Sequence, residues 1–414
     1  MQPKQKTIAI VGGGFGGLNA AILLRKYLRQ EKAHVLLINK SSYHLYYPNL
    51  YEIASSEEEF VSIKALKKSI ALPFTDVLSR HNIQFIEAEV TKIHQKENYV
   101  VFREEKVDYD YLVLATGAIP DFFNIPGAEQ NALTFKSVND ALRVRSNLEA
   151  LVQQAATTTA KRPVRIIIAG GGFTGVELAG ELTNLKKIVA WKYSFPEEKI
   201  EIEIIEGANQ LMPGMGKEVY LPIAERLKEI GVRISFNSMI TEVSEKSITL
   251  KNGEVQNFDM IIWAAGIKGA DIPFDAKTET DHKNRCMTST DLTLKDFSNV
   301  YLIGDNACVL DSNKMPMPQT ATQAIDQAEF VAHNIAASVN GYPTFEYVTK
   351  PSPYIIPVKG KWALLHLANG VNIKGFFAWF VKQFANLRYF MRLLPPWKAI
   401  WLAWFDVEIY TRND

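Results

Sequence analysis

Two glycine-rich loops are the part of this sequence whose chemistry is clearest. In the pattern G-x-G-x-x-G the first glycine permits a tight turn, the second lets a pyrophosphate approach the backbone, and the third lets a helix pack closely on a strand. The helix that follows directs its N-terminal amides at the phosphates. One such pattern is weak evidence, whereas two copies in the same context predict two dinucleotide-binding units. The pattern residues are Gly12, Gly14 and Gly17 in the first loop and Gly170, Gly172 and Gly175 in the second.

Each loop lies between a predicted strand and a predicted helix. Continuous apolar strands are typical of buried parallel sheets, and each helix begins on the glycines of its loop. Another apolar strand follows each helix, which gives one βαβ unit near the N-terminus and a second about half a chain later. The strand, helix and next strand are expected at 7–11, 18–30 and 34–38 in the first unit and at 164–169, 176–184 and 200–205 in the second.

The residue that ends the second strand of each unit distinguishes the two nucleotides. In the second unit this residue is Glu206, whose carboxylate can accept both ribose hydroxyls of NADH and repels a 2′-phosphate. No arginine occurs in 207–209, so NADH is favoured over NADPH. In the first unit the strand ends at Asn39 and Lys40, and the Asn39 amide replaces the usual acid with a weaker ribose contact.

Other strands end in small residues or in an aspartate, as expected beside a nucleotide. Gly304 and Asp305 follow a late strand, and the aspartate can accept a hydrogen bond from a flavin's ribityl hydroxyl. Taken alone, Asp305 could equally be a helix N-cap or a turn residue, and the two glycine loops favour the flavin. Further residues expected to contact the nucleotides are Phe15, Gly16, Ala115, Thr116, Gly117, Phe173, Thr174, Ala265 and Gly266.

The order of these motifs predicts an α/β chain with two nested Rossmann-like domains, one for FAD and one for NADH. A C-terminal segment follows them. The expected bounds are 1–119 and 285–340 for the two parts of the FAD domain, 120–284 for the NADH domain and 341–414 for the C-terminal segment.

The composition sets limits on function. The net charge of +1 gives no bias toward nucleic acid. The two cysteines, Cys286 and Cys308, form no CxxC pair or zinc pattern, so no metal site or disulfide framework is expected and a reducing compartment fits. We expect no signal peptide, and no apolar run reaches the roughly 20 residues of a spanning helix.

The charge pattern changes sharply in the C-terminal segment. No acidic residue occurs between Glu346 and Asp406, and five of the seven tryptophans lie in that stretch. Apolar residues at helical spacing form a stripe there, and Lys382, Arg388 and Arg392 fall off it before Pro395 and Pro396 end the helix. These features predict a monotopic helix on anionic lipid, with a core helix and a homodimer contact as the alternative. The stripe residues are Phe376, Phe380, Phe384, Leu387, Met391 and Leu394.

These motifs, in this order, resemble the two-dinucleotide-binding-domain flavoproteins, above all the type II NADH:quinone oxidoreductases, which are non-pumping respiratory NADH dehydrogenases. The resemblance covers residues 7 to about 330 and weakens in the C-terminal segment. It implies non-covalent FAD, NADH as substrate, a menaquinone- or ubiquinone-type acceptor and attachment to the cytoplasmic face of the cell membrane. Besides the glycine loops and Gly304-Asp305, it rests on Ser42–Leu45, Leu112–Pro120, Phe123–Gly127, Lys136-Ser137 and Ile262–Lys268.

The resemblance also implies four catalytic residues. Gln323 and Gln327 match a quinone-site motif on one helix face, although they could be ordinary polar residues of a first helical turn. Glu177 matches a glutamate near the nicotinamide and the flavin, and it also suits a helix N-terminus. Lys374 resembles a lysine at the quinone end, with a basic membrane-facing residue as the alternative.

Two other functions stay open at this point. A sulfide:quinone oxidoreductase would need reactive cysteines near the flavin, and Cys308 is better explained as a small buried residue. A low-turnover, nucleotide-sensing flavoprotein would lack the quinone face. Quinone-dependent oxidation of NADH distinguishes these alternatives.

Overall fold

The computed structural model describes residues 5–56, 63–158 and 162–412, and its chain divides into two compact units. One glycine loop lies in each unit. The predicted bounds differ from these units in Tyr46–Ala71 and Pro353–Asp414, whose helices pack in the second unit, and in residues 267–284, which belong to the first unit. The first unit comprises Met1–Leu45, Leu72–Ile119 and Ile267–Ser352, and the second comprises Tyr46–Ala71, Pro120–Gly266 and Pro353–Asp414.

The first unit is built on a six-stranded sheet with the order β21-β22-β9-β1-β2-β5. Its inner pairs are parallel, and the edge strand β21 pairs antiparallel with β22. Continuous apolar runs form the central strands because both faces of the sheet are covered. The bounds are β1 Lys6–Val11, β2 Ala33–Asn39, β5 Gln84–Glu87, β9 Tyr111–Leu114, β21 Thr293–Leu294 and β22 Phe297–Leu302.

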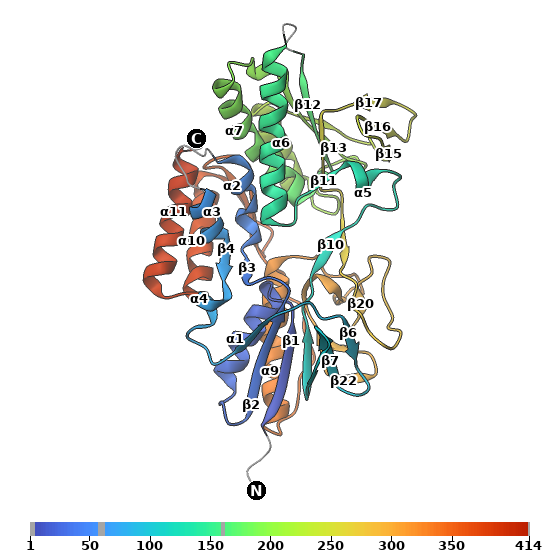
Figure 1. The fold of residues 1–414 in the computed structure, drawn as a ribbon, viewed down its shortest axis with the longest axis vertical. Coiled ribbons are helices and arrows are strands. Elements are labelled where there is room, and N and C mark those ends of the chain that lie inside the picture. The colour runs from blue at the N-terminus through green and yellow to red at the C-terminus, as the bar shows by residue number, and fades with distance from the viewer. Residues whose placement is uncertain (1–4, 57–62, 159–161, 413–414) are drawn as a thin grey trace. The chain divides into compact units, whose positions relative to one another are not determined.

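Two helices pack against each other beside this sheet, α1 (Phe15–Tyr27) and α9 (Ala321–Val339) (Figure 1). Helix α1 begins directly on the first glycine loop and is buried from Gly16 to Leu24. Smaller elements complete the unit. They are β3 Tyr43–Leu45, β4 Ala71–Pro73, α4 Phe74–Leu78, β6 Lys92–His94, β7 Tyr99–Phe102, β8 Glu105–Asp108, β10 Ala118–Pro120, β19 Ile267–Gly269, β20 Cys286–Met287, η3 Gly304–Asn306 and β23 Ala307–Cys308.

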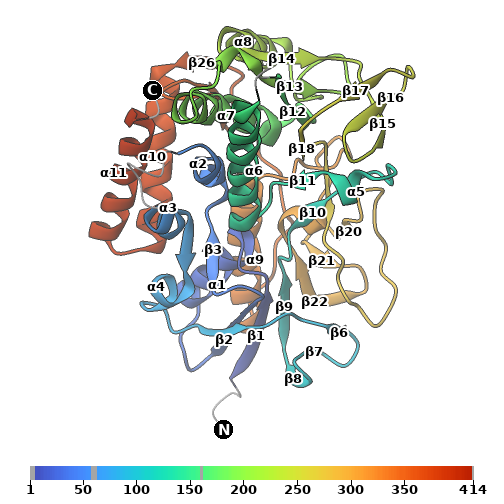
Figure 2. The same cartoon turned by 45° about the horizontal axis from the view of Figure 1, so that its top comes forward.

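The second unit is built on a five-stranded parallel sheet with the order β11-β18-β12-β13-β14. Helices α6 (Val138–Thr157), α7 (Phe173–Lys192) and α8 (Lys217–Glu229) pack against its strands and against one another (Figure 2). Helix α7 begins on the second glycine loop, in the same way that α1 begins on the first. The strand bounds are β11 Leu133–Thr134, β12 Val164–Ala169, β13 Ile200–Ile205, β14 Val232–Ser235 and β18 Met260–Trp263.

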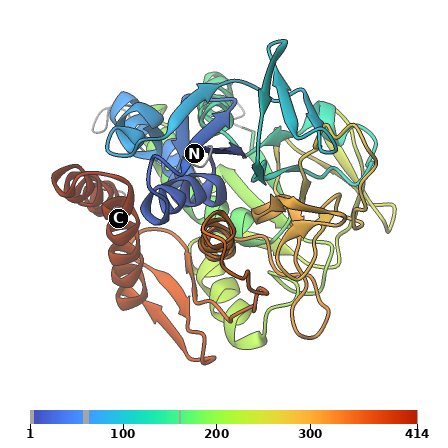
Figure 3. The same cartoon turned by 90° about the horizontal axis from the view of Figure 1, so that it is seen from below.

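The C-terminal segment contributes to the core of the second unit. Its three-stranded antiparallel sheet β24-β25-β26 packs against α10 (Phe376–Leu393), and α10 packs against α11 (Pro396–Arg412) (Figure 3). Trp379 and Phe390 are buried. The remaining elements of the unit are η1 Tyr47–Asn49, α2 Leu50–Ser55, α3 Ile63–Ile70, α5 Ala128–Asn131, η2 Glu197–Lys199, β15 Ile240–Val243, β16 Ser247–Leu250, β17 Val255–Asn257, β24 Tyr354–Pro357, β25 Ala363–His366 and β26 Asn372–Gly375.

The predicted apolar stripe of the C-terminal segment is partly wrong. Phe376, Phe380 and Phe384 are exposed as expected, whereas Leu394 is buried because the chain turns there to begin α11. Lys382, predicted to lie off the stripe among the exposed basic residues, is only 5% exposed. Among the described residues, no helix is both long enough and apolar enough to cross a membrane.

Candidate dinucleotide sites and a buried ionic cluster

The first glycine loop is shaped by two close backbone approaches and one open position. Gly12 has φ +102°, and a Cβ there would lie 2.2 Å from the Ala115 carbonyl oxygen. A Cβ on Gly17 would lie 1.8 Å from the Gly12 oxygen, so the helix could not pack this closely with a larger residue. At Gly14 a Cβ would meet nothing within 4 Å. The loop therefore leaves free backbone surface at the position where the pattern expects a pyrophosphate.

The second loop repeats this geometry in the second unit. Gly170 has φ +101°, and its Cβ would lie 2.4 Å from the Ala265 Cα atom. A Cβ on Gly175 would lie 2.0 Å from the Gly170 oxygen, whereas Gly172 has open space in front of it. Each unit thus carries the same strand–loop–helix device, with its open glycine at the N-terminus of α1 or α7.

Asn39 and Glu206 occupy equivalent places in the two units. The Gly13 amide donates to Asn39 Oδ1 at 2.8 Å, and the Gly171 amide donates to Glu206 Oε2 at 2.7 Å. The Ala208 amide donates to the other Glu206 oxygen at 2.8 Å. The side chain that ends each second strand is therefore fixed against its glycine loop before any ribose arrives.

His44 contacts the backbone of the first loop, and the sequence analysis predicted no role for this residue. It is fully buried, and its Nδ1 lies 3.0 Å from the Gly13 carbonyl oxygen. Burial lowers the pKa of His44 to about 4, so the ring is neutral at neutral pH and its Nδ1–H donates to Gly13. The pattern gave no signal of this role because a single histidine after a strand is common.

Several buried polar atoms fit a flavin nucleotide in the first unit. Thr116 Oγ1 is buried without a hydrogen-bond partner among the described residues, directly after Ala115, which contacts the loop. Both side-chain amide atoms of Asn306, the residue after Asp305, are also buried without a hydrogen-bond partner among the described residues. Because buried polar groups are normally satisfied, these atoms indicate a polar ligand at the open edge of the unit. Lys40, in contrast, is exposed.

The two glutamines expected at a quinone are both buried on α9. Gln327 Oε1 accepts a hydrogen bond from the Gly304 amide at 2.7 Å, so this side chain holds the turn that carries Asp305. Gln323 donates weakly to Ser352 Oγ at 3.4 Å, and its Oε1 is buried without a partner in the described chain. The side-chain oxygen of Gln323 could therefore accept a hydrogen bond from a ligand, whereas that of Gln327 already accepts one from Gly304.

Glu177 and Lys374 lie in different environments within the second unit. Glu177 is partly exposed near the start of α7, and desolvation raises its pKa to about 8 against the opposing effect of the Lys382 charge. Lys374 is exposed on strand β26. The buried lysine of the C-terminal segment is therefore Lys382, which local sequence patterns had placed on the polar face.

Lys382 belongs to a buried ionic cluster. In this cluster, side chains of the C-terminal helices contact residues near Asn49 in the second unit. Its Nζ donates to Asn49 Oδ1 at 3.2 Å, and its charge lies 5.8 Å from the centre of the Tyr51 ring. Glu52, Glu181 and Asp406 are buried around it, with exposures of 1%, 2% and 3%. Desolvation raises the pKa of Glu181 to about 7 and also raises the pKa of Glu52 well above its ordinary value. Burial therefore favours the neutral forms of both of these carboxyl groups.

The two cysteines do not form a reactive pair. Parallel strands β20 and β23 pair Cys286 with Ala307 and Met287 with Cys308. Since adjacent residues of a strand point to opposite faces, the two thiols lie on different sides of this ladder. Both are buried, and burial raises the pKa of each thiol, so neither is the thiolate that sulfide chemistry needs.

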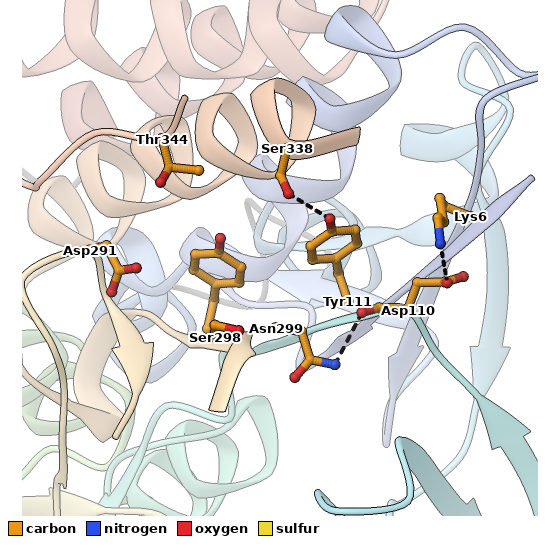
Figure 4. Close-up of a pocket in the computed structure, with 9 residues that line it drawn as sticks. Lys6, Asp110, Tyr111, Asp291, Ser298, Asn299, Ser338 and Thr344 are labelled. Carbon is orange, nitrogen blue, oxygen red and sulfur yellow. Dashed lines mark hydrogen bonds and ion pairs between the residues drawn. The ribbon is translucent and has the colours of Figure 1, made fainter. Parts of the chain in front are cut away.

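Two other polar clusters in the first unit lie away from the glycine loop. His94, Glu97 and Asp275 could together offer ligand atoms to a metal ion, although both carboxylates are exposed. A polar hollow of about 310 Å³ lies at the starts of β1, β9 and β22, whereas the loop follows the end of β1 (Figure 4). Its side chains largely bond to each other, as Lys6 does to Asp110 at 2.8 Å.

The comparisons with known proteins place this geometry in a class. Residues 6–328 match the family model described as pyridine nucleotide-disulphide oxidoreductase. The type II NADH:quinone oxidoreductase of Staphylococcus aureus (strain NCTC 8325 / PS 47) is 30% identical over 358 residues, which cover 84% of this chain and 87% of that protein. The chain therefore belongs to the pyridine nucleotide-disulphide oxidoreductase class and, within it, to the type II NADH:quinone oxidoreductases.

Solved structures share the fold. NDH2 from Plasmodium falciparum in complex with NADH matches with a TM-score of 0.81 at 19% identity, over 97% of both chains. The sulfide:quinone oxidoreductase of Aquifex aeolicus matches with a TM-score of 0.75 at 20% identity, over 95% of this chain and 91% of that chain. The predicted family and the predicted α/β fold are thereby confirmed.

Proposed function

We propose that the protein oxidises NADH and reduces a membrane quinone of the menaquinone or ubiquinone type, without pumping protons. The observation that carries the proposal is the pair of matched glycine loops, one hydrogen-bonded to Asn39 and the other to Glu206, in a chain of the type II NADH:quinone oxidoreductase family. Bound FAD would supply the chemistry, accepting a hydride from NADH and passing two electrons to the quinone.

The chain's own residues would position the two nucleotides. Gly12 to Gly17, Thr116 and Asp305 would hold FAD, with Gln327 fixing the turn of Asp305. Gly170 to Gly175 would hold the NADH pyrophosphate at the N-terminus of α7, and Glu206 would accept its ribose hydroxyls. Further contacts are proposed for Phe15, Gly16, Asn39, Lys40, Ala115, Gly117, Phe173, Thr174, Ala265, Gly266 and Gly304.

The remaining candidate residues would act on the quinone and on protons. Gln323, whose amide oxygen is buried without a partner in the described chain, is the better candidate for a quinone contact. Glu177 would hold a proton at neutral pH because desolvation keeps its carboxyl group neutral. Lys374, exposed on β26, would lie on the lipid side.

The two C-terminal helices support attachment to lipid. Phe380 and Phe384 on α10 are 56% and 63% exposed, and Trp397 and Trp404 on α11 are 67% and 60% exposed. Exposed aromatic side chains interleaved with basic residues are typical of helices that lie in a membrane interface. We call the exposed apolar residues of these helices the apolar face; they are Phe376, Phe377, Phe380, Phe384, Met391, Trp397, Ile400, Trp401 and Trp404.

A lipid-soluble quinone would reach a monotopic enzyme from the membrane that the apolar face contacts. We place the protein on the cytoplasmic face of the cell membrane, where NADH is available. A homodimer is compatible with this arrangement and is a separate proposal.

The deciding experiment is an NADH oxidation assay of the purified, FAD-containing protein with and without a soluble quinone. Quinone-dependent turnover well above the rate with oxygen alone is the expected result. NADH oxidation that no quinone accelerates would leave the nucleotide-sensing function in its place. Sulfide-dependent quinone reduction would establish the sulfide oxidase function instead, which the separated cysteines argue against.

A further inference from the structure

A hydrogen-bonded chain connects the last helix to the buried lysine of the second unit. Asp406, on α11, accepts from Asn49 Nδ2 at 2.6 Å and from Asn386 Nδ2 at 2.9 Å. With its amide turned, Gln383 donates to the same carboxylate. Asn386 in turn accepts from the Tyr46 hydroxyl at 2.7 Å. These groups are buried, and amide groups of the chain donate hydrogen bonds to the carboxylate.

The orientation of Asn49 is set by this carboxylate. An ionised Asp406 can only accept hydrogen bonds, so the amide of Asn49 must point its NH₂ group at Asp406. Its carbonyl oxygen then faces the other way, where it accepts from Lys382 Nζ at 3.2 Å. With its amide reversed, Asn49 would present donors to an ammonium group, which is itself a donor. The charge on Asp406 therefore determines whether Asn49 can hold the protonated Lys382.

We propose that Asp406 is a positioning residue which, through Asn49, holds the Lys382 ammonium beside Glu177 and Glu181. The helix that carries part of the apolar face thereby contributes to the electrostatics of the first turns of α7. The proposal rests on the proposed function for the use of Glu177 in turnover, whereas the chain from Asp406 to Lys382 is independent of it.

The titratable groups around the hydrogen-bonded chain from Asp406 to Lys382 come from four helices and from connecting segments. The Lys382 charge acts on both Glu177 and Glu181, and it favours their ionised forms. Glu52 shares a hydrogen bond with Asp406, and desolvation, with the nearby Asp406 carboxylate, raises the pKa of Glu52 well above its ordinary value. The groups that face the chain are Glu52 and Tyr51 from α2, Glu177 and Glu181 from α7, Lys382 from α10, Asp406 from α11, and Tyr46 and Lys359 from the connecting segments.

The test is to titrate the Glu177 carboxyl group in the purified protein and to monitor its protonation by infrared difference spectroscopy. The Glu177 band is assigned by its loss in Glu177→Gln. Asp406→Asn should raise the pKa of Glu177 above its value of about 8, by about one unit, because the Lys382 charge is no longer held nearby. Lys382→Met should shift the pKa in the same direction and at least as far.

The double variant distinguishes action through Lys382 from an independent effect. If Asp406 acts by positioning Lys382, Asp406→Asn combined with Lys382→Met should shift the Glu177 titration no further than Lys382→Met alone. Asn49→Ala should also raise the pKa of Glu177, because this substitution breaks the hydrogen-bonded chain while leaving the Asp406 and Lys382 side chains in place. Glu408→Gln, the same chemical change on the same helix, is the matched control and should leave the titration unchanged.

Two results would overturn the proposal: a folded Asp406→Asn protein with an unchanged Glu177 titration, or additive shifts in the double variant. If Asp406→Asn does not fold, Asn49→Ala decides, and an unchanged titration there would have the same consequence. Because the titration needs no turnover, a protein that fails to reduce quinone would refute the proposed function without affecting this measurement.

Discussion

At the scale of single residues, Asn39 and Glu206 show how two copies of one loop can differ in the nucleotide they accept. Both side chains are anchored by the amide of the second loop residue, at 2.8 and 2.7 Å. The anchored carboxylate of Glu206 brings a full negative charge to the place where a 2′-phosphate would lie. The amide of Asn39 brings no charge. At this position the two sites therefore differ by one ionisable group.

This difference predicts the specificity for the reduced nucleotide. Wild-type protein should show a much higher kcat/KM with NADH than with NADPH, and Glu206→Gln should narrow that ratio by about tenfold, or ~1.4 kcal/mol. The glutamine keeps one acceptor for the Gly171 amide, so the loop should survive. Steady-state kinetics with both nucleotides measure the effect, and comparable kcat/KM values in the wild type would refute the assignment of Glu206.

A second prediction concerns the buried Glu181. Its folded pKa of about 7 lies above the ordinary glutamate pKa of 4.5, so between these pH values the folded state binds more protons than the unfolded state. Stability attributable to this group is therefore present at low pH and is lost as the pH rises from about 4.5 through 7. Glu181→Gln should raise the Tm at pH 8 by a few degrees and change it much less at pH 5. Thermal unfolding at the two pH values checks the sign, and an equal change at both would contradict it.

At the scale of elements, the glycine loops separate positions needed for packing from a position needed for a ligand. Gly17→Ala places a methyl group 1.8 Å from the Gly12 oxygen and should destabilise α1 and the sheet. Gly14→Ala meets open space and has an ordinary φ of −72°, so the protein should fold with nearly wild-type Tm but retain much less FAD. FAD content and Tm of the two variants check this, and full FAD content in Gly14→Ala would refute the ligand role of that position.

The C-terminal helices predict how the protein meets lipid. Removing them would uncover Glu52 and Asn49, because α10 and α11 supply the partners of these buried residues. Point substitutions on the apolar face avoid this problem. Phe380→Ser and Trp404→Ser, together, should weaken sedimentation with anionic liposomes by at least tenfold, since each buried aromatic contributes roughly 1.5–3 kcal/mol.

Trp191→Ser is the matched control for this experiment. Trp191 is 76% exposed near the end of α7 and lies outside the apolar face, so its loss should leave liposome binding unchanged. Reduction of a soluble quinone should survive in both the double variant and Trp191→Ser, while reduction of a long-chain quinone in liposomes should fall only in the double variant. Normal sedimentation of the double variant would favour a homodimer contact on this face.

At the scale of the whole molecule, the predicted pair of nucleotide folds implies a defined cofactor content. Purified protein should carry one FAD per chain, held without a covalent bond by the first loop and the turn of Asp305. Acid precipitation should therefore release the yellow colour into the supernatant. A pellet that stays yellow over a colourless supernatant would show covalent attachment instead.

Much of this architecture could be predicted from the sequence because its signals are local. The glycine loops, the buried strands and the equivalence of Asn39 with Glu206 all depend on residues close together in the chain. The partners of Lys382 could not be predicted in this way. Its hydrogen bond to Asn49 spans 333 residues, and a lysine among aromatic residues in a basic segment has the local pattern of a surface residue. The buried role of His44 was missed for a similar reason, because the Gly13 carbonyl that it contacts gives no sequence signal.

The hydrogen bond between Asn49 and Asp406 joins residues 357 positions apart, near the two ends of the chain. On the ribosome, the strands and helices around Glu206 are therefore synthesised long before the carboxylate that completes their ionic core. The second unit cannot bury Glu52 and Lys382 with their partners until α10 and α11 have been synthesised. The helices that carry the apolar face are synthesised after both nucleotide-binding sheets, so completion of this core and formation of the proposed lipid-binding surface fall in the same late step of biosynthesis.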